Sequence, residues 1–140
     1  MADGVTVRRV LPILFVSVGV LVTMDIVGAL TGRPLGFPYP RLGVISLLIY
    51  FAVGALAAWR GNFTDGIAAS MLVGLLDGTL GPVAAWLVGP GPVDQTIAEP
   101  GIFAYQVAVI TGTATTIGVA GALAASWLER RRIVHRIVPR

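Results

Sequence analysis

The sequence predicts an all-α polytopic integral membrane protein, a bundle of four transmembrane helices that forms a single domain over residues 1–140. Charged residues make up 12% of the chain, against about 25% in a typical soluble domain, and hydrophobic residues make up 56%. The stretches 42–59 and 100–128 carry no charge. A helix needs about 20 mainly apolar residues to cross the hydrocarbon core, so this composition fits a bilayer better than water.

Four spans are expected at about 10–30, 42–59, 66–88 and 102–128, followed by a basic tail at 129–140. Pro12 falls in the first turn of the first span, where a missing N–H does no harm. The start also resembles a signal peptide, but Asp25 interrupts the apolar run and no clear cleavage site follows, so we expect an uncleaved span. Stretches rich in proline and glycine at 31–43 and 89–101 forbid a continuous helix and separate the spans.

The arginines predict the orientation. Four spans place both termini on one side, and eight of the ten arginines fall on that side while Arg33 and Arg41 fall opposite. Because cytoplasmic segments carry an excess of basic residues, we expect both termini in the cytoplasm. The chain contains no lysine and is rich in alanine, glycine and valine, which favours a bacterial inner membrane. The cluster Arg130, Arg131 and Arg132 could contact anionic lipids or could serve only as the topology signal.

Small residues at four-residue spacing predict where helices approach closely. In lipid, association depends on close backbone contact at such residues. The third span carries one ladder, and the fourth span carries another in the same register. We expect these ladders to pack against each other or against another subunit. The predicted packing residues are Gly66, Ser70, Gly74 and Gly78 in the third span, and Ala108, Gly112, Thr116 and Ala120 in the fourth.

Two aspartates interrupt the apolar spans. An unpaired carboxylate at the bilayer centre is costly, so Asp77, and with it Asp25, should face the protein interior or a water-filled cavity. No lysine, arginine or histidine lies inside a span as a partner, and we expect hydroxyl groups to serve instead, above all those of Thr111 and Thr115. Gly81 and Pro82 predict a kink or a short break in the third helix, since proline removes a backbone donor.

The sequence excludes several chemistries. It has no cysteine, so thiol catalysis and cysteine-held clusters are absent, and its one histidine, His135, lies in the tail. No metal-ligand cluster, nucleophile motif or phosphate loop is present. We therefore expect no enzyme activity, no cofactor, no metal site and no nucleic-acid partner.

Two functions remain open at this stage. The first is a structural or accessory membrane protein, working as a homo-oligomer or as a subunit of a larger membrane complex. The alternative is a small proton- or cation-coupled transporter or channel that uses Asp77, with Asp25 as a second acid. The sequence does not show whether the two aspartates meet.

Overall fold

The structure of the protein is a computed structural model that describes residues 4–32, 40–88 and 99–137, and side chains within 10–31, 43–88 and 99–131. It contains helices α1 (Gly4–Gly32), α2 (Pro40–Arg60), α3 (Phe63–Val88) and α5 (Pro100–Ile137). All four are long and apolar enough to cross a membrane, and the described residues include no strand. The predicted fold class is confirmed, and the protein is a multi-pass membrane protein.

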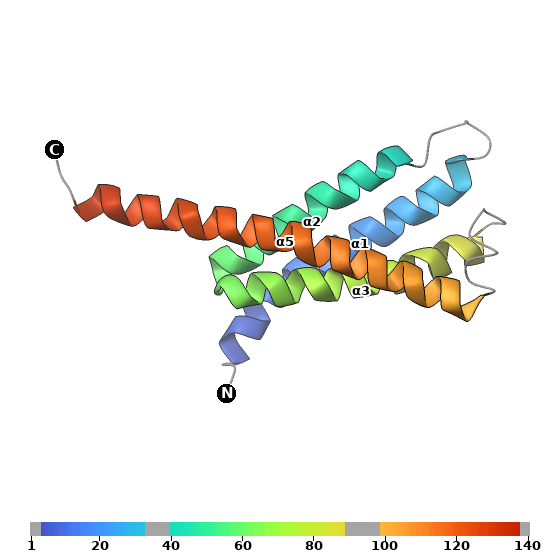
Figure 1. Ribbon diagram of the computed structural model, residues 1–140, viewed down its shortest axis with the longest axis horizontal. Helices are drawn as coiled ribbons and strands as arrows, with labels where there is room; N and C mark the ends of the chain where they lie inside the picture. Colours follow the sequence, from blue (N-terminus) through green and yellow to red (C-terminus); the bar gives the residue numbers. More distant parts are fainter. Residues whose placement is uncertain (1–3, 33–39, 89–98, 138–140) are drawn as a thin grey trace.

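Successive helices run in opposite directions. Figure 1 shows the first turns of α1, the last turns of α5 and the turn between α2 and α3 toward the left of the view, with the opposite ends of the four helices toward the right. The turn is short because Asn62 and Asp65 cap α3 reciprocally. The Asp65 N–H donates to Asn62 Oδ1 and the Asn62 N–H donates to Asp65 Oδ2, both at 3.0 Å. Two otherwise unpaired donors are thus satisfied where α3 begins.

Helix α3 is the centre of the bundle and packs on each of the other three helices. Its ladder residues Gly66, Ser70, Gly74 and Gly78 are all buried. A Cβ added at Gly74 would lie 2.5 Å from Ala114 Cβ and 3.0 Å from Thr111 Cα. At Gly66 it would lie 2.6 Å from the carbonyl oxygen of Gly54. Such distances leave no room for a side chain, so this ladder forms a close contact inside the chain.

The predicted ladder on α5 is not the face that packs. Ala108, Gly112, Thr116 and Ala120 are exposed, and a Cβ added at Gly112 would meet nothing within 4 Å. The buried face instead follows Ala114, Gly118, Gly121 and Ala122. The physical reason is helical phase: Ala114, Gly118 and Ala122 keep the same four-residue spacing but are shifted by two residues, which places them about 200° around the helix from the predicted ladder. Small residues occupy both faces of α5, so their spacing alone does not select the face that packs. The expectation that the two ladders pack on each other is therefore corrected.

Of the kink or short break predicted at Gly81 and Pro82, the break is absent, because α3 continues through both residues to Val88. Proline removes one backbone hydrogen bond, but the bonds on either side remain. Both residues are buried in the bundle, where the packing of neighbouring helices holds the backbone in place.

Candidate functional site

Asp77 lies near the middle of α3 and inside the bundle. Its side chain is 7% exposed, and Ser70 is the other buried polar side chain among the described residues. The two differ in how they are satisfied. Ser70 Oγ donates to the carbonyl oxygen of Gly66 in its own helix at 2.9 Å, whereas Asp77 takes its partner from another helix. The hydrogen bond of Asp77 therefore links two spans.

That partner is Tyr50, near the middle of α2. The Tyr50 side chain is 3% exposed, and its hydroxyl donates to Asp77 Oδ2. Buried tyrosine hydroxyls usually have a hydrogen-bond partner, because leaving one unpaired costs free energy. The phenol and the carboxyl group thus satisfy each other in a region where lipid offers no alternative.

Asp25 of α1 joins the same cluster across Gly81. A Cβ added at Gly81 would overlap Asp25 Oδ2, and it would lie 3.1 Å from Asp25 Cγ and 3.6 Å from Asp77 Oδ1. Both carboxyl groups therefore lie beside one point on the surface of α3, which is open only because residue 81 has no side chain. Three helices, α1, α2 and α3, each contribute one polar side chain to this cluster, which we call the acid site (Asp25, Tyr50 and Asp77).

Two carboxyl groups beside each other inside a membrane are electrostatically costly. Moving one charged carboxylate to the bilayer centre costs at least about 2.5–3.5 kcal/mol, and two carboxyl groups in one small volume repel each other when both are ionised. A proton or a cation bound at the acid site would relieve this repulsion.

Of the two threonines predicted as partners, Thr115 bonds within its own helix and Thr111 has no recorded hydrogen bond from its hydroxyl to the described residues. Thr115 Oγ1 donates to the carbonyl oxygen of Thr111 at 2.7 Å and Thr116 Oγ1 to that of Gly112 at 2.8 Å. This back-bonding within a helix is common for threonine. Thr111 itself packs against Gly74, and its buried Oγ1 has no hydrogen bond to the residues that the structure describes. No recorded hydrogen bond joins either of the predicted site residues Thr111 and Thr115 to Asp77.

Sequence reasoning missed Tyr50 and the role of Gly81. Tyr50 could have been found from its position in the sequence. Tyrosine favours the membrane–water interface, so a tyrosine in the middle of the apolar run 44–58 needs a hydrogen-bond acceptor inside the bundle. Gly81 was noted for the backbone, but its function in the structure is to leave space for the Asp25 carboxyl group.

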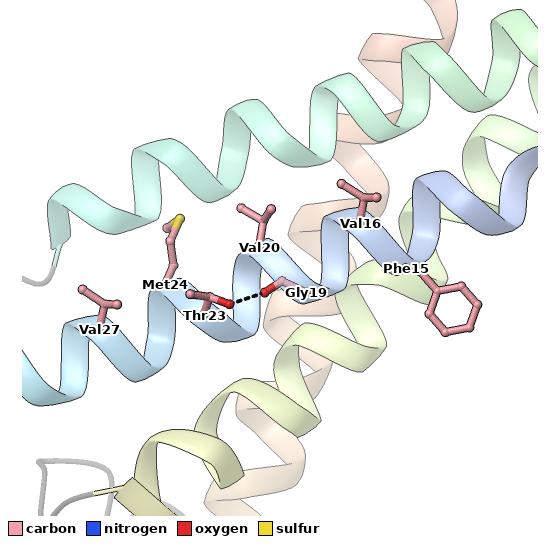
Figure 2. A pocket seen from close by; sticks show the side chains of 7 residues that line it. All are labelled: Phe15, Val16, Gly19, Val20, Thr23, Met24 and Val27. Carbon is pink, nitrogen blue, oxygen red and sulfur yellow. Dashed lines mark hydrogen bonds between the residues drawn. The ribbon is translucent and has the colours of Figure 1, made fainter.

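A shallow groove of about 530 Å³ lies along the outer face of α1. Figure 2 shows its lining side chains, which are Phe15, Val16, Gly19, Val20, Thr23, Met24 and Val27. The lining is almost entirely apolar, and the Thr23 hydroxyl already donates to the carbonyl oxygen of Gly19 at 2.7 Å. In a bilayer this surface faces lipid chains, and it offers no polar path to the acid site.

Within the described part of the chain, no three His, Cys, Asp or Glu side chains gather as a metal site would require. The acid site offers two carboxyl groups and one phenol. Comparison of the chain with protein-family models, with curated proteins and with solved structures finds no match.

Proposed function

We propose that the protein is a small proton- or cation-coupled carrier or channel, and that the acid site is where the ion binds. The observation that carries this proposal is the meeting of two carboxyl groups at Gly81, with Tyr50 on the far oxygen of Asp77. Intramembrane carboxyl groups are costly and are a common device for moving protons and cations across membranes.

The alternative role for Asp77 is a hydrogen-bonding clamp that fixes α2 against α3. A clamp requires one carboxyl group and one donor, which Asp77 and Tyr50 already supply. A clamp of this kind does not use the second carboxyl group, that of Asp25, which lies beside the same glycine. An ion site gives the second carboxyl group a use, because it can share the proton or help to hold the cation.

Flux in liposomes tests the proposal. The purified protein is reconstituted with a pH-sensitive dye inside, and proton flux is measured with and without sodium or potassium gradients. We expect Asp77→Asn to abolish flux while its folded yield stays normal, since the amide is nearly isosteric. Asp65→Asn is the matched control, because it makes the same change in the first turn of the same helix, away from the acid site. If ion flux survives in Asp77→Asn, Asp77 does not bind the transported ion.

We further place the protein in a bacterial inner membrane with both termini in the cytoplasm. The support for this orientation is the arginine bias. The start of α1 and the ends of α2 and α5 lie toward the same end of the bundle (Figure 1), and Arg60 ends α2 while Arg130 and Arg131 belong to the last third of α5. The chain has no cysteine, so single cysteines at Asn62 and Gln95 can report the side reached by an impermeant thiol reagent. We expect labelling of Gln95→Cys alone in intact cells.

A second candidate is an accessory subunit or homo-oligomer. The exposed ladder of α5 favours it, since Ala108, Gly112, Thr116 and Ala120 could receive another helix closely. The native mass of the protein, extracted gently from its own membrane, tests this candidate. A defined complex with a larger membrane protein would support an accessory role, whereas a chain found alone as a monomer would contradict it.

A further inference from the structure

Helix α5 is longer than the membrane requires. Its 38 residues span about 57 Å at about 1.5 Å per residue, against a hydrocarbon core of about 30 Å. In Figure 1 its red end projects well past the turn that joins α2 to α3. Ala122 is the last buried residue of α5 among those whose side chains the structure describes, and its Cβ would lie 2.9 Å from a Cβ on Gly66. The helix then continues to Ile137, about 22 Å further.

The contact at Gly66 also sets the depth of this projection. With the middle of α3 at the bilayer midplane, Gly66 and Ala122 lie about 14 Å from the midplane, beside the edge of the hydrocarbon core. Trp127 is five residues further along α5, or about 7 Å. That distance corresponds to the headgroup region, which is about 5–7 Å deep on each side. Tryptophan is enriched at this level.

Arg131 is held in an ordered position at this depth. Its guanidinium carbon lies 3.7 Å from the centre of the Trp127 ring, in the stacked arrangement that favours a cation over an indole face. Stacking occupies the flat face of the guanidinium group and leaves its N–H edge available for a bidentate contact with phosphate. Trp127, Arg130 and Arg131 are all exposed.

The charge of this end is strongly positive. Among the residues whose backbone the structure describes, two carboxyl groups, those of Asp65 and Glu129, belong to the helix segments at this end, against seven arginines: Arg8, Arg9, Arg60, Arg130, Arg131, Arg132 and Arg136. Arg60 is exposed at the end of α2 on the same end of the bundle. The side chain of Arg132 lies outside the described residues, although its backbone continues the helix.

We propose that the projecting end of α5 binds anionic phospholipid headgroups of the adjoining leaflet, with Arg131 held on Trp127 and Arg130 beside it as the phosphate contacts. Depth favours lipid over a soluble acidic partner, because the stacked pair lies within reach of the headgroups. The electrostatic attraction between one basic residue and an anionic membrane surface is strong enough to enrich anionic lipids around that residue several-fold. This proposal is independent of the proposed ion site.

Fluorescence of Trp127 tests the proposal directly. A Trp59→Phe/Trp86→Phe background leaves Trp127 as the single tryptophan, and circular dichroism verifies that it folds. The protein is placed in phosphatidylcholine vesicles that contain a minor fraction of either brominated phosphatidylglycerol or brominated phosphatidylcholine. We expect the anionic brominated lipid to quench the fluorescence of Trp127 at least about twofold more than the zwitterionic brominated lipid does. High salt should remove this difference.

Two variants complete the test. Arg130→Gln/Arg131→Gln should lose the preference for the anionic lipid while quenching by the zwitterionic lipid persists. Arg41→Gln, which removes an arginine near the opposite end of the bundle, should keep the preference. Equal quenching of the parent background by both lipids would overturn the proposal. Absence of quenching by either lipid would overturn it as well, by placing this end away from the membrane and pointing to a soluble partner.

Discussion

Helix α3 makes two close contacts of opposite character. Toward α5 it presents Gly66, Gly74 and Gly78, where backbones approach with no side chain between them. Toward α1 and α2 it presents Asp77 and Gly81, where polar side chains from three helices meet. The first contact depends only on shape. The second depends on which groups carry protons and hydrogen bonds.

This difference separates what holds the bundle together from what gives it chemistry. In the glycine contact an added methyl group at Gly66 or Gly74 would lie within 3.0 Å of a neighbouring helix, at a carbonyl oxygen or an alanine Cβ that cannot turn aside, so even this small group is costly. In the acid site the ends of the side chains can turn, so the site tolerates a change of side-chain shape better than a change of functional group. Substitutions in the glycine contact should therefore lower stability, whereas substitutions in the acid site should mainly change ion flux. The following variants distinguish these two effects.

The largest effect is expected at Gly54, where α2 crosses α5. A Cβ there would overlap the carbonyl oxygen of Gly118 and lie 2.7 Å from its Cα, and neither atom can move without shifting the helix. We expect Gly54→Ala to lower the free energy of unfolding by about 3 kcal/mol, measured by unfolding in mixed micelles. Gly112→Ala is the matched control, since a Cβ there meets nothing within 4 Å. It should cost nothing, and a similar loss in both variants would contradict the packing described.

Asp77→Leu should have the next largest effect. It leaves the buried Tyr50 hydroxyl without an acceptor, at a cost of about 1–3 kcal/mol, while Asp77→Asn should cost less because the amide oxygen can still accept. The free energies of unfolding of Asp77→Leu, Tyr50→Phe and the double variant form a cycle. Hydrogen bonds in membranes contribute about 0.6 kcal/mol and at most about 1.7 kcal/mol in such cycles. Strict additivity would show that the two side chains do not interact.

Gly81→Ala should have the smallest effect on stability and a large effect on function. The added methyl group would displace the Asp25 carboxyl group, which is the end of a side chain and can turn aside, so we expect a loss of less than about 1 kcal/mol. Ion flux should fall sharply, because Asp25 no longer lies beside Asp77. Normal flux in Gly81→Ala would mean that the proximity of the two carboxyl groups is not needed.

Much of the fold could be predicted from composition, because apolar runs of membrane-crossing length admit few alternatives to helices. The acid site was only partly predictable. Asp77 and Asp25 were recognisable as costly groups in an apolar setting, but their convergence depends on how α1 and α3 pack. Tyr50 became the partner of Asp77 through packing that no local pattern in α2 encodes.

The packing faces show the same limit. A ladder of small residues identifies a helix able to approach another closely, and α3 uses its ladder in this way. On α5 the residues Gly118 and Ala122 pack while the longer ladder through Gly112 stays exposed. The choice of face depends on α2 and α3 together, since both cross α5, and one helix read alone does not contain that information.

The most direct test of the central claim is an infrared titration of the carboxyl groups in the reconstituted protein. The acid site as described makes Asp25 and Asp77 one coupled unit, so they should titrate as a pair. The account predicts that Asp25→Asn and Tyr50→Phe each move the pH midpoint at which the protonated carboxyl band of Asp77 disappears, whereas Asp65→Asn leaves it unchanged. A midpoint that is the same in the parent protein and in both site variants would contradict the account.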